Sequence, residues 1–176
     1  MKKNEVIVVL HNIRSLHNVG SIFRTADAAG VSKLYLCGVT PKPVDRFGAY
    51  RQELQKVALG AERTVLWEHF TNTTVLLKRL KGDGYKIFAV EQAAHSKRFD
   101  TVRLGRREKI VLVLGDEVRG LSPLILRTAD TIIEIPMHGV MVRQAHHPKN
   151  QKVFRGKESL NVSVAFGIII FSLLYQ

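Results

Sequence analysis

Residues 111–120 read V-L-V-L-G-D-E-V-R-G, an apolar run that ends in a glycine followed by two acids. An apolar run of this length, bounded by a turn residue, is typical of a strand buried on both faces of a parallel sheet. In open α/β sheets, ligands bind at the carboxyl ends of such strands. We therefore expect Asp116 and Glu117 to lie at the ligand-binding edge of a sheet.

Similar β-branched segments alternate with helical patterns along the chain. The expected strands are residues 6–10, 33–37, 86–91, 109–114 and 131–136, with a weaker candidate at 65–69. The expected helices are residues 20–29 closed by Gly30, residues 73–81 closed by Gly82, a segment from Ser122 and Pro123 to about 129, and a last one from about 158–159. The pattern predicts one α/β domain over residues 1–176, with a mainly parallel sheet and helices on both faces.

The composition is strongly basic. The chain of 176 residues has 27 Lys plus Arg against 15 Asp plus Glu, a formal net charge of +12. That excess favours a polyanionic partner such as nucleic acid, with a solvated basic surface as the alternative. Cys37, the single cysteine, excludes a disulfide framework and a cysteine-based zinc cluster. Both apolar ends are too short for a signal peptide or a bilayer span, so we expect a cytoplasmic protein without membrane contact.

The usual nucleotide-binding and hydrolase motifs are missing. No G-x-x-x-x-G-K-[ST] sequence occurs, which excludes an ordinary P-loop. The G-x-G at Gly82 and Gly84 precedes an expected strand instead of following one, so it is not a dinucleotide fingerprint. A G-x-S-x-G nucleophile elbow is also absent.

A polar segment follows the first expected strand. Residues 11–27 read H-N-I-R-S-L-H-N-V-G-S-I-F-R-T-A-D. We expect Asn18, Gly20, Ser21 and Arg24 to cluster at a helix start, where backbone N–H groups and a cationic side chain hold an anion. The alternative is an N-cap and a solvent-facing arginine.

A second polar segment lies near the C-terminus. Residues 158–167, E-S-L-N-V-S-V-A-F-G, place Ser159, Asn161 and Ser163 on an otherwise apolar helix. Buried hydroxyl and amide groups need partners, so these residues are either helix caps or ligand contacts.

Taken in order, the three segments resemble the TrmH/SpoU branch of the SPOUT methyltransferases. The segment with Asn18 and Arg24 resembles motif 1 of that family, with both residues at its signature positions. L-G-D-E-V-R-G-L-S from Leu114, with I-P-M-H-G from Ile135, resembles motif 2, and S-L-N-V-S-V-A from Ser159 resembles motif 3. The resemblance extends through nearly the whole chain.

The resemblance implies a deep trefoil knot at the C-terminal end of the α/β domain, a rare exception to unknotted topology. It implies S-adenosylmethionine as the cofactor, bound in the knot by Leu114, Gly115, Glu117, Ile135, Met137, Ser159 and Leu160. It also implies a homodimer formed through the C-terminal helix and methyl transfer to a ribose 2′-hydroxyl of tRNA or rRNA.

By the same resemblance, the catalytic residues are Arg24, Asn18, Ser159, Asn161 and Glu117. A 2′-hydroxyl is a poor nucleophile until its proton is removed, so the site needs in-line positioning and a proton acceptor more than it needs a metal. A guanidinium stays protonated under ordinary conditions, which favours a phosphate anchor over a base for Arg24. The structural alternatives are a helix cap for Ser159, a surface acid for Glu117 and a satisfied core amide for Asn161.

The chain departs from the family pattern at residues 140–156, V-M-V-R-Q-A-H-H-P-K-N-Q-K-V-F-R-G. Gly139 and Ser159 lie twenty positions apart, whereas the family's motif 3 serine normally follows within a few residues. The stretch supplies four cations and no acid, and its adjacent histidines lack a third ligand, so we expect no metal. Closure entropy grows slowly with loop length, which favours a tolerated extrusion. An RNA-contacting arm and a disruption of the cofactor site are the alternatives.

Two other functions remain open from the sequence. A non-catalytic RNA-binding protein with this fold would explain the charge and the insertion at 140–156. A small-molecule methyltransferase is a weaker interpretation, because the basic surface disfavours it.

Overall fold

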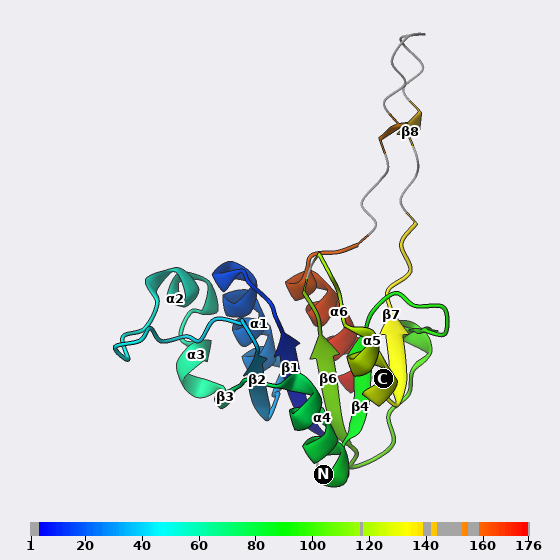
Figure 1. Cartoon of the computed structure of the whole chain (residues 1–176), viewed down its shortest axis with the longest axis horizontal. Helices are drawn as coiled ribbons and strands as arrows, with labels where there is room; N and C mark the ends of the chain where they lie inside the picture. The colour runs from blue at the N-terminus through cyan, green and yellow to red at the C-terminus, as the bar shows by residue number, and fades with distance from the viewer. Residues whose placement is uncertain (1–3, 117, 139–141, 144–152, 155–158, 176) are drawn as a thin grey trace.

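The computed structural model describes the chain except residues 1–3, 117, 139–141, 144–152, 155–158 and 176. Seven parallel strands form one sheet in the order β3-β2-β1-β6-β4-β7-β5 (Figure 1). The strands are β1 Glu5–His11, β2 Lys33–Cys37, β3 Trp67–Phe70, β4 Lys86–Val90, β5 Lys97–Arg98, β6 Lys109–Leu114 and β7 Thr131–Glu134. Strands β8 (Val142–Arg143) and β9 (Val153–Phe154) pair antiparallel in a separate two-stranded sheet.

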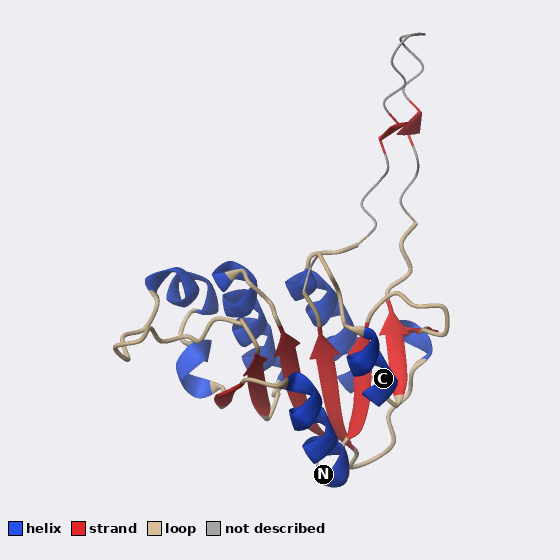
Figure 2. Ribbon diagram, in the orientation of Figure 1, coloured by secondary structure: helices blue, strands red, loops and turns tan. Residues whose placement is uncertain are grey.

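Helices cover both faces of the main sheet (Figure 2). They are α1 Leu16–Ala29, α2 Gln52–Ala58, α3 Ala61–Thr64, α4 Thr73–Gly82, α5 Pro123–Thr128 and α6 Val162–Leu174, with a 3-10 turn η1 at Phe99–Thr101. Helices α1, α2, α3 and α6 share one apolar core with the sheet, and α4 and α5 share the other. The predicted α/β architecture, with a parallel sheet between two helical layers, is confirmed.

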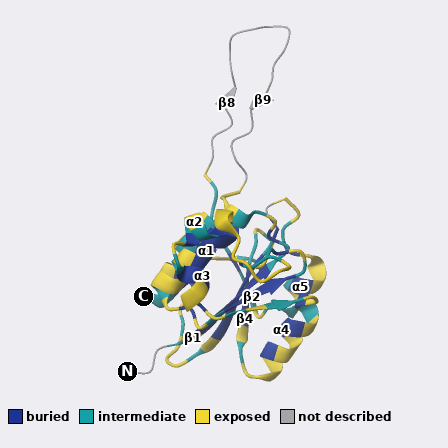
Figure 3. Ribbon diagram, turned by 90° about the vertical axis from the view of Figure 1, so that its left-hand side faces the viewer, coloured by how far each residue is buried: buried dark blue, intermediate teal, exposed yellow. Residues whose placement is uncertain are grey.

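The central strands β1 and β6 contribute side chains to the apolar cores on both faces of the sheet. Val8 and Leu10 face the core under α1 and α6, whereas Ile7 and Val9 face the core under α4. Side chains alternate across a strand, so a strand buried on both faces must be apolar at every position. This is why the apolar runs identified these strands correctly, and Figure 3 shows the buried residues gathered in the sheet.

The expected strands mostly match in position. Residues 33–37 and 109–114 coincide with β2 and β6, and residues 6–10 fall within β1. The expected strands at 86–91 and 131–136 end earlier, at Val90 and Glu134, and the candidate at 65–69 is β3, shifted to 67–70.

The predicted start of the first helix was wrong. Helix α1 begins at Leu16, because the Ser15 hydroxyl accepts a hydrogen bond from Asn18 N at 3.2 Å and caps it there. Arg24 therefore lies in the middle of α1, whereas Asn18 lies in its first turn, and the anion site expected there stays a prediction. The predicted end was right, since Gly30 caps the helix at φ +71°.

Two other helix boundaries differ from expectation. Helix α6 begins at Val162 with Asn161 as its N-cap, so Ser159 is not the cap. Gly82 is the last residue of α4 instead of its cap. Helices α2 and α3 were not predicted, and both are short. Helix α2 has no side-chain cap, and its C-cap is Leu59 in the left-handed conformation instead of a glycine.

The trefoil knot stays a prediction, because much of the segment that would form it lies outside the described residues. Among the described residues, no helix is long and apolar enough to cross a membrane.

Candidate functional site

The loop after β6 is held by a buried carboxylate. Asp116 Oδ1 accepts hydrogen bonds from Val118 N and Arg119 N, both at 2.8 Å, and its Oδ2 lies 3.4 Å from Arg14 Nε. The hydrogen bond from Arg119 N lowers the pKa of Asp116 below its ordinary 3.8; burial opposes this, while Val118 N and the Arg14 charge add to it. Asp116 therefore stays ionised and fixes the loop.

Asp116→Ala is expected to lower the free energy of unfolding by about 1–2 kcal/mol at pH 7, because two charge-assisted hydrogen bonds are lost. Since the pKa of Asp116 is lower in the folded state than in the unfolded state, its stabilisation is complete above the unfolded value near 3.8. It is lost as the pH falls through the folded value. Urea unfolding at pH 7 and pH 3 checks both points; a difference between wild type and variant that is as large at pH 3 contradicts the assignment.

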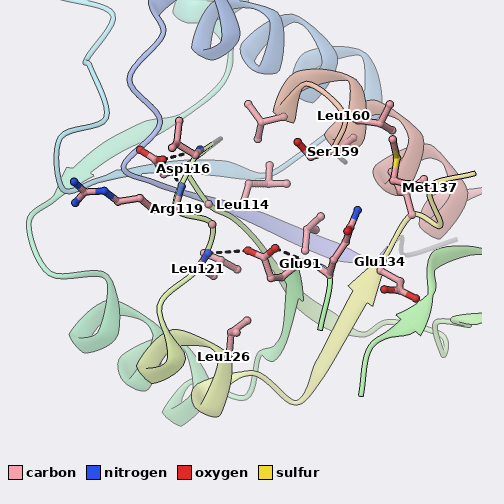
Figure 4. Close-up of a pocket in the computed structure, with 18 residues that line it drawn as sticks. Glu91, Leu114, Asp116, Arg119, Leu121, Leu126, Glu134, Met137, Ser159 and Leu160 are labelled. Carbon is pink, nitrogen blue, oxygen red and sulfur yellow. Dashed lines mark hydrogen bonds between the residues drawn. The ribbon is translucent and has the colours of Figure 1, made fainter. Parts of the chain in front are cut away.

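A second carboxylate, Glu91, holds the other end of this loop. It follows β4, and its Oε2 accepts a hydrogen bond from Leu121 N at 2.8 Å while its Oε1 accepts one from Gln92 N at 3.0 Å (Figure 4). Gly120, at φ +63°, passes so close that an added Cβ would lie 2.2 Å from Glu91 Oε2. Glu91 was not among the residues predicted from the sequence, although it is an acid at the end of an expected strand, the same signal that identified Asp116.

A pocket of about 500 Å³ opens beside this loop, at the carboxyl ends of β4, β6 and β7 (Figure 4). Its described lining residues are Val90, Glu91, Gln92, Leu114, Gly115, Asp116, Val118, Arg119, Gly120, Leu121, Leu126, Glu134, Ile135, Met137, Ser159, Leu160, Val162 and Ala165. The position agrees with the general rule that open parallel sheets bind ligands at this edge.

The structure brings most of the expected cofactor residues to this pocket. Those that line it are Leu114, Gly115, Ile135, Met137, Ser159 and Leu160. Glu117, expected in both the cofactor set and the catalytic set, lies outside the described residues. Segments more than forty positions apart thus meet around one cavity.

Asn18 and Asn161 are in direct contact. Asn161 Nδ2 donates a hydrogen bond to Asn18 Oδ1 at 3.0 Å, and Asn161 Oδ1 accepts from Ser163 N at 2.8 Å and from the Ser163 hydroxyl at 2.7 Å. Asn161 follows the pocket residue Leu160 in the chain, and Asn18 is buried on α1. This hydrogen bond joins the first turn of α1 to the N-cap of α6.

Arg24 lies six positions further along α1 than Asn18 and is exposed. It is not among the residues that line the pocket. Because Arg24 is exposed, truncation of its side chain leaves the buried core intact.

A separate polar cluster lies at the carboxyl ends of β1 and β2. His11 Nδ1 and Thr73 Oγ1 are hydrogen-bonded at 2.7 Å, and burial lowers the pKa of His11. Burial also raises the pKa of the Cys37 thiol to about 11, so it is not a thiolate nucleophile at neutral pH. Within the described part of the chain no group of His, Cys, Asp and Glu could hold a metal ion; His146 and His147 lie outside it.

Comparison with known proteins gives a consistent result. A model described as the SpoU rRNA Methylase family matches residues 5–143, ending inside the 140–156 stretch. A 23S rRNA (guanosine-2′-O-)-methyltransferase RlmB from Ralstonia nicotianae is 32% identical over 171 residues, which is 97% of this chain and 59% of the relative. A tRNA (guanosine(18)-2′-O)-methyltransferase from Aquifex aeolicus is 31% identical over 175 residues, covering 99% of this chain and 71% of the relative.

Solved structures agree with these relatives. The AdoMet-bound rRNA methyltransferase from Sinorhizobium meliloti has a TM-score of 0.75 at 27% identity, covering 97% of this chain and 56% of that one. The A. aeolicus TrmH/SpoU tRNA modifying enzyme has a TM-score of 0.75 at 30% identity, covering 97% and 74%. The chain thus spans less than two thirds of the length of several relatives that it matches.

Proposed function

Because the chain belongs to the SpoU rRNA methylase family, we propose that it transfers a methyl group from S-adenosylmethionine to a ribose 2′-hydroxyl of RNA. The observation that carries the proposal is that motif 2 residues from Leu114 and motif 3 residues from Ser159 line the same pocket. Relatives named as guanosine 2′-O-methyltransferases of 23S rRNA and of tRNA support the ribose hydroxyl as acceptor. Those names do not favour the non-catalytic RNA-binding alternative.

The lining of the pocket suits this cofactor. The described carboxylates are Glu91, Asp116 and Glu134, against one guanidinium, that of Arg119. S-adenosylmethionine carries positive charge on its sulfonium and its ammonium group, so an acidic lining is complementary to it. The remaining lining is largely apolar, as an adenine ring requires, and about 500 Å³ lies within the usual range of about 300–1,000 Å³ for ligand pockets.

When bound, S-adenosylmethionine supplies an electrophilic methyl group. The site has to hold the 2′-hydroxyl in line with that group, and the hydroxyl proton has to be removed. We assign Arg24 to the phosphate beside the target ribose, because a guanidinium makes bidentate contacts with phosphate. Asn18 and Asn161 would position α1 against the pocket through their hydrogen bond, with Ser159 and Glu117 completing the site.

We further propose a homodimer formed through α6. Exposed apolar residues recur at helical spacing along α6 and at its C-cap: Val164, Ile168 and Phe171, then Tyr175. A stripe of this kind on one helix face is typical of an interface. The relatives' names include both tRNA and rRNA enzymes, so either RNA is a candidate substrate, and we place the protein with these RNAs in the cytoplasm.

Isothermal titration calorimetry of the purified protein with S-adenosylmethionine tests the proposal most directly. We expect binding of about one cofactor per subunit, because the residues that line the pocket are in place. An absence of heat and of thermal stabilisation at millimolar cofactor would contradict it and would favour the non-catalytic alternative.

Removal of residues 140–156, which joins Gly139 to Lys157, is expected to leave folding and methyl transfer at least as good as in the parent. The reason is that β8 and β9 form a sheet of their own, apart from the seven strands of the main sheet. Measurement of RNA affinity against salt concentration checks this expectation. If the stretch is an RNA arm, affinity will fall and the slope of log affinity against log salt will flatten by about 0.7–0.9 per lost phosphate contact, for up to four cations.

A further inference from the structure

The connection between β2 and α2 extends outward at the left of Figure 1. It carries two aromatic rings, each beside an arginine. Phe47 is 80% exposed and Tyr50 39% exposed. Arg46 Cζ lies 4.7 Å from the centre of the Phe47 ring, and Arg63 Cζ lies 4.9 Å from the centre of the Tyr50 ring. Single exposed apolar side chains are common on proteins, but two neighbouring rings that each pair with a guanidinium form a distinct surface cluster.

The backbone under these rings is well connected. Asp45 Oδ1 accepts hydrogen bonds from Phe47 N at 2.8 Å and Ala49 N at 3.0 Å. Asp45 N donates to Ala49 O at 2.8 Å, and Val44 and Tyr50 form an antiparallel bridge. This segment, which we name the 43–51 turn, therefore holds Phe47 at its tip in a defined position instead of burying it.

Residues 42–51 carry a net positive charge. Lys42, Arg46 and Arg51 supply three cations against the single carboxylate of Asp45, which is engaged by two backbone N–H groups. The sequence K-P-V-D-R-F-G-A-Y-R at 42–51 thus interleaves cations with aromatic rings. Surfaces that bind single-stranded nucleic acid combine these two features, since bases stack on the rings and cations follow the phosphates.

We propose that the 43–51 turn is a binding site for single-stranded RNA, where Phe47 stacks on an unpaired base and Arg46 and Arg51 contact neighbouring phosphates. The choice of RNA over a protein partner rests on the proposed function. The site itself is separate from methyl transfer, because no residue of the turn lines the pocket. The 43–51 turn thus recognises unpaired bases, such as those of an RNA loop.

Fluorescence anisotropy with labelled oligouridine and with a labelled RNA duplex tests this proposal. Phe47→Ala is expected to weaken oligouridine binding roughly tenfold, while duplex binding changes less than about twofold, because paired bases cannot stack on the ring. Phe47→Trp should keep the affinity of the wild type. Leu66→Ala, which truncates another exposed apolar side chain at 69% exposure, is the matched control and should have no effect.

The salt dependence separates stacking from charge. Phe47→Ala should leave the slope of log affinity against log salt unchanged, whereas Arg46→Ala or Arg51→Ala should flatten it by about 0.7 each. Oligouridine binding by Phe47→Ala that equals the wild type, or a wild type that binds neither RNA, overturns the proposal and favours a protein contact for the turn. These assays contain no cofactor. If RNA binding depends on Phe47 but calorimetry finds no binding of S-adenosylmethionine, the proposed function is contradicted while the RNA-binding site is supported.

Discussion

Arg24→Ala is expected to lower the rate of methyl transfer to RNA at least about a hundredfold, with cofactor affinity and Tm close to those of the wild type. Arg24 is exposed on α1 and does not line the pocket, so its truncation removes neither core packing nor cofactor contacts. A lost phosphate anchor would instead misplace the ribose relative to the methyl group. Single-turnover transfer of labelled methyl groups to RNA from cells that lack the gene measures the rate.

Two further variants sharpen this experiment. Arg24→Lys should fail almost as severely, because an ammonium cannot reproduce the planar contacts of a guanidinium. Arg79→Ala removes another exposed cation, from α4 on the other face of the sheet, and should turn over normally. Normal turnover by Arg24→Ala would end the catalytic assignment, and a loss shared by Arg79→Ala would show that net charge alone is responsible.

Gly115→Ala is expected to weaken S-adenosylmethionine binding by tenfold or more and to lower the free energy of unfolding by about 1–3 kcal/mol. A Cβ at this position would lie 2.7 Å from the carbonyl carbon of Gly120 and 2.9 Å from its oxygen. Backbone atoms cannot rotate away as a side chain can, so the whole loop that lines the pocket must shift. Calorimetry and thermal unfolding report the two effects.

Gly82→Ala is the matched control for this substitution. An added Cβ there would meet nothing within 4 Å, and Gly82 ends α4 far along the chain from the loop. Since alanine favours the helix, the control should be neutral or slightly stabilised and should bind cofactor normally. If Gly115→Ala binds cofactor as tightly as this control does, the loop tolerates displacement and the pocket is not where the cofactor is held.

The order of strands and helices could be predicted because its signals are local. A strand buried on both faces must be apolar throughout, so β2 and β6 could be placed residue by residue. Helix ends with strong cap residues were also found, at Gly30 and at Ser122. The caps at Ser15 and Asn161 were missed although Ser and Asn are preferred N-cap residues, and the predicted helix starts were off by three or four positions.

The parts of the site could be predicted only where the signal lies within one segment. Asp116 was recognisable because it follows a buried strand, and Leu114 and Ser159 through the resemblance of their segments to known motifs. Gly20 was grouped with the residues expected to bind an anion, and its packing role was not predicted. In the structure it lets α2 approach α1, since an added Cβ would lie 2.9 Å from Leu54 O.

The sequence by itself determined the α/β class, the two helical layers and the segments that reach the carboxyl edge of the sheet, because periodicity and turn chemistry act over a few residues. The tertiary structure alone decided which of these segments meet. The strand order places β4 beside β6, so that Glu91 reaches Leu121, and the packing of α6 on α1 joins Asn161 to Asn18 across 143 positions. Contacts over such separations depend on how the whole core packs, and no local pattern encodes them.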